Sequence, residues 1–127
     1  MRTLVDNVHF RLTKENADVY RLTRSAAEFE SAAALVATHD ELAMAFSAVP
    51  KNRSRILVDL RHAPSRNDEA FEALMKEQLP RLYRGWERLA VVVATSIGRL
   101  HIERHMRSHF FEGRAFENAD AALTYLS

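Results

Sequence analysis

Three histidines recur at intervals of four residues in the last third of the chain, at positions 101, 105 and 109. In a helix, His101, His105 and His109 would share one face, and two imidazoles spaced in this way can bind one metal ion. The chain has no cysteine, and Glu103 lies about 200° around the helix from His101. Because the sequence names no further ligand, we expect no metal and no other cofactor. We interpret the histidines as a polar, partly protonated surface stripe.

Arginines accompany this stripe, because Arg99, Arg104 and Arg107 lie on the adjoining face of the same expected helix. Residues 51–114 contain more Lys and Arg than Asp and Glu, whereas the formal net charge of the whole chain is only +1. Such an excess can belong to solvated helix faces, or to a basic surface that attracts an acidic partner or a phosphate. The near-neutral total gives no reason to expect nucleic acid. We interpret the expected helix as a docking surface for another protein.

A second group of polar residues follows two strand-like runs of the sequence. In an open α/β sheet, ligands bind beyond the carboxyl ends of the strands, where helix N-termini favour an anion. Two helix N-termini and Arg61 could hold a phosphate or a carboxylate, or the polar residues could simply cap the helices. No glycine-rich loop supports a nucleotide. The candidate ligand- or partner-binding residues, which include two arginines of the expected histidine helix, are Asp59, Arg61, His62, Ser65, Asn67, Thr95, Ser96, Arg99 and Arg104.

Catalysis finds little support in these residues. Ser65, His62 and Asp59 are the residue types of a hydrolase triad, but they lie within seven residues of one another on a single turn. Triads usually take their members from separate elements, and the chain lacks a nucleophile elbow. We therefore expect a binding protein and no enzyme.

The elements that must position these groups begin with two apolar runs, at 55–60 and 89–94, each leading into an amphipathic helix. Short apolar runs separated by a helical pattern are typical of a parallel βαβ unit whose sheet is covered on both faces. Pro80 should kink or interrupt the helix between them, and Gly85 suits its C-terminal cap. Asn67 or Asp68 should cap its N-terminus.

The rest of the chain alternates strand and helix patterns in the expected order β-β-α-β-α-β-α-β-α. The first helix begins with Ser31 as its cap, or later at a capping box that starts with Thr38. The other expected elements are a hairpin of strands at 8–13 and 19–23, helices at 31–49, 97–108 and 119–126, the third of these capped by Asn118, and a short strand at 110–116.

Length and composition indicate one domain that spans residues 1–127. With 47% hydrophobic residues, the chain can build one core and is too short for two ordinary domains. No run approaches the roughly 20 apolar residues that a membrane span needs, and the first residues lack the apolar region of a signal peptide. We therefore expect a cytoplasmic protein with no stable membrane insertion.

This order of elements, the strand 56–60 that leads into a helix, and the ending 116–126 resemble the SpoIIAA-like superfamily. That superfamily contains STAS domains and stand-alone bacterial proteins of the STAS/SEC14-like kind. The resemblance implies a single-domain α/β fold, with a mixed sheet of four to five strands and helices packed mainly on one face. It also implies a non-enzymatic role in binding proteins, nucleotides or lipids.

The chain departs from the STAS pattern at the phosphorylation motif. STAS-type antagonists of anti-sigma factors carry an Asp-Ser-Ser-Gly-like motif at the start of the helix after this strand. Here only Ser65 lies near the corresponding place, without an adjacent Ser-Gly. Ser65 is therefore either a phosphorylation site or a turn residue after Pro64.

Two functions follow as hypotheses. The first is a regulatory protein-binding module of a bacterial signalling or partner-switching system, which should lose its partner when Arg61 or Arg104 is reversed in charge. The alternative is a carrier of a small ligand, a nucleotide or a lipid, with a pocket of several hundred Å³. A homodimer through an exposed sheet edge or the region of Trp86 is compatible with either hypothesis.

Overall fold

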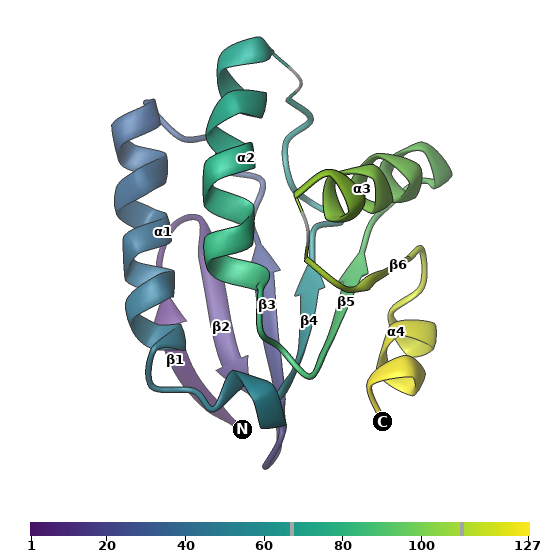
Figure 1. Cartoon of the computed structure of the whole chain (residues 1–127). Helices are drawn as coiled ribbons and strands as arrows, with labels where there is room; N and C mark the ends of the chain where they lie inside the picture. The colour runs from purple at the N-terminus through teal and green to yellow at the C-terminus, as the bar shows by residue number, and fades with distance from the viewer. Residues whose placement is uncertain (67, 110) are drawn as a thin grey trace.

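The strands of the protein form one mixed sheet, seen in the computed structural model that describes residues 1–66, 68–109 and 111–127 (Figure 1). Within these residues the sheet has six strands, which lie side by side in the order of the chain. The first three strands are antiparallel, and the last four, from β3 onward, are parallel. The strands are β1 (Arg2–Asp6), β2 (Phe10–Lys14), β3 (Val19–Arg24), β4 (Arg55–Asp59), β5 (Arg88–Val92) and β6 (Arg114–Phe116).

Helices cover the two faces of this sheet unequally. The larger core lies between the sheet and three helices, to which Phe46 of α1, Leu82 of α2 and Met106 of α3 contribute. The smaller core lies on the other face, where Leu126 of α4 packs on Leu57. The helices are α1 (Ala32–Phe46), α2 (Glu69–Tyr83), α3 (Ser96–His109) and α4 (Ala119–Leu126), and a 3-10 turn, η1 (Lys51–Arg53), precedes β4.

The two central parallel strands explain why the apolar runs were continuous. Along β4, Ile56 and Val58 enter the larger core while Leu57 enters the smaller one. Successive side chains of a strand point to opposite faces, so a strand covered on both sides needs apolar residues at every position. The predicted βαβ unit and the mixed sheet with helices mainly on one face are confirmed.

The sheet has one strand more than the upper limit that we expected, because β1 pairs with β2 at the edge. The pairing is irregular between Thr3 and Val5, and Val5 is the buried side chain of this strand. An edge strand with so few buried residues lacks the alternation on which the prediction relied. The predicted hairpin of β2 and β3 is present, with Leu12 opposite Leu22.

Most helix ends follow the local signals. The Ser31 side chain accepts a hydrogen bond from the Ala34 backbone N–H, so α1 begins at the earlier of its two expected starts. Asp68 caps α2 through the Phe71 N–H, whereas the other expected cap, Asn67, lies outside the described residues. Asn118 caps α4.

The predicted interruption of the helix at Pro80 and the predicted length of the last strand were wrong. Helix α2 continues through Pro80 to Tyr83 and ends, as predicted, before Gly85, whose φ of +92° suits a residue without a side chain. The Arg84 N–H bonds the Pro80 carbonyl, so the turn that follows the proline is closed by a helical hydrogen bond. The last strand is shorter than the expected 110–116, since it spans Arg114–Phe116, and residue 110 lies outside the described residues.

No helix in the described ranges combines the length and the apolar character that crossing a membrane would need.

Candidate functional site

The polar residues predicted at the sheet edge form two separate groups in the structure. The first group is centred on Asp59, whose side chain is only 4% exposed. Arg61 donates from Nε to Asp59 Oδ1 at 3.0 Å and from Nη2 to Oδ2 at 2.7 Å, and its backbone N–H bonds Oδ1 at 3.1 Å. Arg21 Nη2 lies 3.5 Å from the same carboxylate. Asp59 therefore anchors the loop that follows β4.

The electrostatics of Asp59 agree with this anchoring role. Burial alone would raise the pKa of Asp59, but the hydrogen bonds and positive charge of Arg61, aided by Arg21, outweigh burial and hold the pKa below its ordinary value. Asp59 and Val58 are successive residues of β4, so their side chains point to opposite faces of the sheet. Val58 enters the larger core, so Asp59 points to the same face as Leu57 and α4. The pair thus lies on the opposite face of the sheet from α2 and α3.

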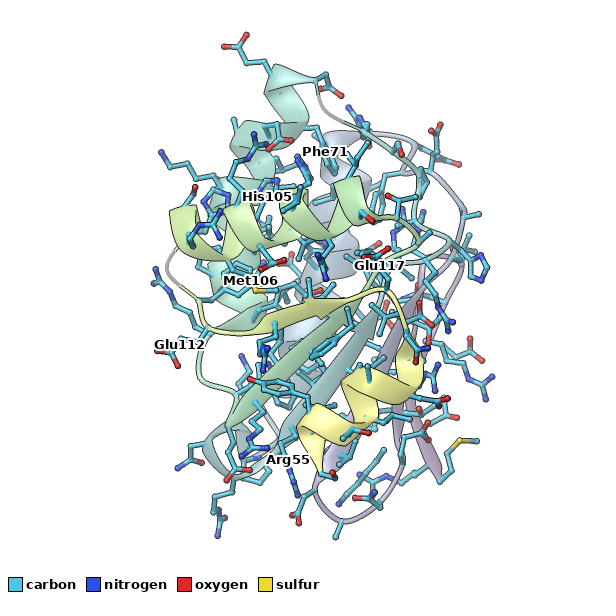
Figure 2. All side chains as sticks on the ribbon, turned by 90° about the vertical axis from the view of Figure 1, so that its right-hand side faces the viewer. Arg55, Phe71, His105, Met106, Glu112 and Glu117 are labelled. Atoms are coloured by element: carbon cyan, nitrogen blue, oxygen red, sulfur yellow. The ribbon has the colours of Figure 1, made fainter. Side chains whose placement is uncertain are left out.

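The second group follows β5 and joins the start of α3 to the turn before α4. Thr95 Oγ1 accepts a hydrogen bond from the Gly98 N–H at 3.0 Å and so acts as the predicted cap. Ser96 Oγ donates to Glu117 Oε1 at 3.0 Å, and Arg99 Nε lies 3.8 Å from Glu117 Oε2. Glu117 is labelled in Figure 2. No hydrogen bond or ion pair among the described residues connects this group with Asp59.

The loop between β4 and α2 carries the remaining predicted residues. His62 and Ser65 are exposed, and Asn67 lies outside the described residues. Asp59 bonds to the arginines, and no hydrogen bond within the described ranges joins it to His62 or Ser65. The arrangement is therefore not that of a Ser-His-Asp triad.

The outer face of α3 exposes two apolar side chains followed by two arginines. Ile97 is 81% exposed and Leu100 is 63% exposed. Arg104 and Arg107 are exposed as well, and spacings of three and four residues place these side chains on one side of the helix. We call Ile97, Leu100, Arg104 and Arg107 the outer face of α3.

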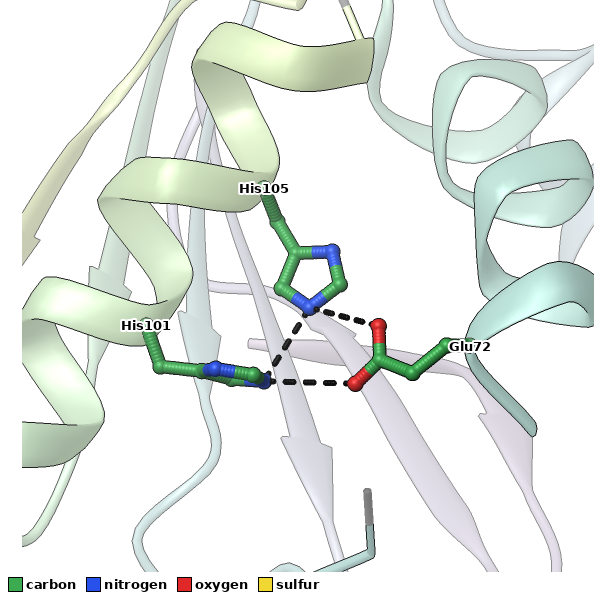
Figure 3. A group of neighbouring side chains, drawn as sticks. All are labelled: Glu72, His101 and His105. Carbon is green, nitrogen blue, oxygen red and sulfur yellow. Dashed lines mark hydrogen bonds and ion pairs between the residues drawn. The ribbon is translucent and has the colours of Figure 1, made fainter. Parts of the chain in front are cut away.

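The inner face of α3 carries two of the histidines toward α2, where they meet Glu72 (Figure 3). His105 Nε2 lies 3.3 Å from Glu72 Oε2, and His101 Nε2 lies 3.6 Å from Glu72 Oε1. The two Nε2 atoms are 3.1 Å apart. The interpretation of a surface stripe therefore holds only in part, because His105 is buried.

Two further contacts complete the histidine cluster. Arg104 Nη2 lies 3.1 Å from His101 Nδ1, and His105 Nδ1 lies 3.0 Å from His109 Nε2. Burial lowers the pKa of His105 below the ordinary histidine value, and the nearby charge of Glu72 offsets this effect only in part. Glu72, His101 and His105 are the residues of the described chain that could hold a metal ion.

Sequence reasoning missed Glu72, although a weak signal was present. Met75 and Leu79, three and seven residues further along α2, are apolar and partly buried. A glutamate beside the buried face of a helix is only partly exposed to solvent, and its carboxylate often pairs with a polar or charged side chain. The partner could not be identified, because the packing of α2 on α3 is a tertiary contact.

The surface of the described residues also has two depressions of about 500 Å³ each, and both are open to solvent. One lies between the end of α1 and η1, beside Phe46 and Lys51. The other lies between α3 and β6, beside Met106 and Phe111. The volume is that expected for a carrier, but the open shape is not that of a site that encloses a ligand.

Comparisons with known proteins address the fold. No protein-family model matches the chain, and none of the curated proteins matches it. Among solved structures, the chain is similar to an uncharacterized protein of the DUF3478 family with a SpoIIAA-like fold, from Shewanella loihica PV-4. The two share 15% sequence identity and superpose with a TM-score of 0.64 over 97% of this chain and 98% of that one. The protein therefore has the SpoIIAA-like fold that its sequence pattern resembles.

Proposed function

We propose that the protein is a non-enzymatic, regulatory protein-binding module whose docking surface is the outer face of α3. The exposure of Ile97 and Leu100 carries this proposal. Single exposed apolar residues are normal on a protein surface, and Met44 on α1, at 77% exposed, is one of them. Ile97 and Leu100 differ from Met44 because they are neighbours on one side of a helix, where a partner could bury both.

The charges around these residues indicate the chemistry of the partner. Arg104 and Arg107 follow the apolar pair on the same side of α3, so carboxylates opposite them would be attracted. The proposed partner is therefore a polypeptide that presents apolar side chains beside acidic residues, such as an amphipathic acidic helix. The SpoIIAA-like fold and the resemblance to STAS domains support a place in bacterial cytoplasmic signalling.

The two arginines proposed as charge-reversal tests from the sequence are not equivalent. Arg61 bonds the buried Asp59 on the other face of the sheet, so reversing its charge would destabilise the fold as well as any interface. Arg104 is exposed on α3, and Arg104→Glu is the cleaner test. Ser65 is exposed in the loop before α2, as a phosphorylation site must be, and its modification remains part of the proposal.

Site-specific photo-crosslinking in the native host tests the proposal. A photoreactive residue in place of Leu100 should capture one defined polypeptide, and Ile97→Asp in the same chain should abolish the capture. The same photoreactive residue in place of Met44 is the matched control, since that position, on another helix, is at least as exposed as Leu100. Capture of the same polypeptides from both positions, or of none from Leu100, would contradict the proposal.

Two alternatives are outcomes of related measurements. Crosslinking of position 100 to a second copy of the chain would show that the outer face of α3 forms a homodimer and does not bind another protein. Native mass spectrometry of the protein from its host would reveal a bound nucleotide or lipid, as the carrier hypothesis requires.

A further inference from the structure

Glu72, His101 and His105 place their ligand atoms at the spacing of a metal site. In tetrahedral zinc sites the bonds to histidine nitrogen and carboxylate oxygen are about 2.0–2.2 Å, so two ligand atoms lie about 3.3 Å apart. The three corresponding distances here are 3.1 Å between the imidazoles and 3.3 Å and 3.6 Å from imidazole to carboxylate. The two carboxylate contacts run to different oxygens of Glu72, Oε1 for His101 and Oε2 for His105. One ligand atom from each of the three residues lies within 4.8 Å of the others, so the three side chains converge at spacings close to those of a tetrahedral metal site.

The surroundings of His105 fit the same role. A metal bound at Nε2 requires the imidazole proton on Nδ1, and zinc-bound histidines usually donate that proton to a second group. His105 Nδ1 lies 3.0 Å from His109 Nε2, which can accept it. The histidine spacing of four thus supplies two ligands and an outer partner that orients one of them.

His101 differs because Arg104 lies at its Nδ1. A guanidinium can only donate a hydrogen bond, so this contact holds the imidazole proton on Nε2, the atom that faces Glu72. Metal binding therefore requires the Arg104 side chain to move away and the proton to shift to Nδ1. Arg104 is exposed, so its side chain can move away without displacing buried residues.

We propose that Glu72, His101 and His105 form a binding site for a divalent transition metal ion, with zinc the best match. Two imidazoles favour zinc, nickel or copper over magnesium and calcium, which prefer oxygen ligands. The His101 and Glu72 side chains are 37% and 30% exposed, so the fourth position faces solvent and is open to water or to a group of a partner. The ion would join α2 to α3 beside the docking surface, a property beyond the proposed function.

Zinc titration of the untagged protein, followed by calorimetry, tests this site. The wild type should bind one zinc ion per chain, and its melting temperature should rise with zinc concentration. Glu72→Gln and His101→Gln should each weaken binding by more than the about 10- to 100-fold that loss of an outer partner costs. His9→Gln is the matched control, because His9 lies in the β1–β2 loop and stacks on Phe29, and it should bind like the wild type.

Three results would overturn the site: no saturable zinc binding by the wild type, unchanged affinity in both Glu72→Gln and His101→Gln, or an equal loss in His9→Gln. The melting temperature of each variant without metal shows whether it is folded, so a folding defect cannot imitate a lost ligand. The assay contains no partner protein, so its failure would leave the docking proposal untouched.

Discussion

Replacement of Arg61 by alanine should destabilise the protein far more than its exposed position suggests. Asp59 is a nearly buried carboxylate, and Arg61 supplies both of its short side-chain hydrogen bonds. Arg61→Ala leaves Asp59 with the backbone N–H of residue 61 and the longer contact to Arg21. Removing one partner of a buried charge pair costs about 3–5 kcal/mol. Because Arg61 itself is more than a third exposed, we expect a smaller loss of about 1–3 kcal/mol.

The matched control is Arg66→Ala. Arg66 and Asp68 form an ion pair with the same 2.7 Å separation and the same spacing of two residues, but both side chains are nearly half exposed. Arg66 also lies over the Phe71 ring. Exposed pairs of this kind contribute little to stability, because water screens their attraction. Urea denaturation at pH 7 should therefore show a larger loss of stability for Arg61→Ala than for Arg66→Ala.

The pH dependence checks the physical cause. The pKa of Asp59 is lowered in the folded state, so its contribution is present above the unfolded value of about 3.9 and is lost as the pH falls through the folded pKa. The difference between wild type and Arg61→Ala should therefore shrink below about pH 4. Equal losses in Arg61→Ala and Arg66→Ala, or a difference that persists in acid, would refute the reasoning.

Three further variants test other parts of the structure. Burial lowers the pKa of His39 in the folded protein to about 4, so as the pH falls the unfolded chain binds a proton before the folded protein does. The free energy of unfolding should therefore fall by about 2–3 kcal/mol between pH 6.5 and 4. Urea titrations of the His39→Gln variant should lack this fall. A Cβ atom at Gly113 would lie 2.8 Å from Leu89 Cδ2 and 2.9 Å from the Leu89 carbonyl oxygen. Gly113→Ala should therefore lower the free energy of unfolding by about 1–3 kcal/mol. An unchanged melting temperature would contradict this close packing. Arg104→Ala frees Nδ1 of His101 and removes a positive charge, so zinc calorimetry should find tighter binding than in the wild type, and weaker binding would contradict Nε2 as the ligand atom.

Local signals in the sequence predicted much of the fold. Ser31, Thr95 and Asn118 cap their helices because a cap depends on a side chain and a backbone N–H two or three residues away. The buried runs of β4 and β5 were recognised because both faces of a central parallel strand must be apolar. Strand β1 was missed because an edge strand buries too little to leave a pattern.

The candidate sites were harder to predict, since they depend on which surfaces meet. Asp59 ends one parallel strand and Ser96 follows the next, yet they bond to different partners: Asp59 bonds Arg61 on the α4 side of the sheet, and Ser96 bonds Glu117. Sequence spacing could not distinguish these directions. It did identify the outer arginines of α3, because their exposure follows from the helical repeat alone.

The sequence by itself determined what depends on neighbours along the chain: the helix caps, the buried parallel strands, and the spacing that puts His101 and His105 on one face of α3. Only the tertiary structure decided that Glu72 stands opposite them, because α2 and α3 come from different βαβ units and meet only when both pack on the same face of the sheet. The periodic pattern of a sequence shows which residues share one face of one helix. The partner of that face is set by the packing of the whole core.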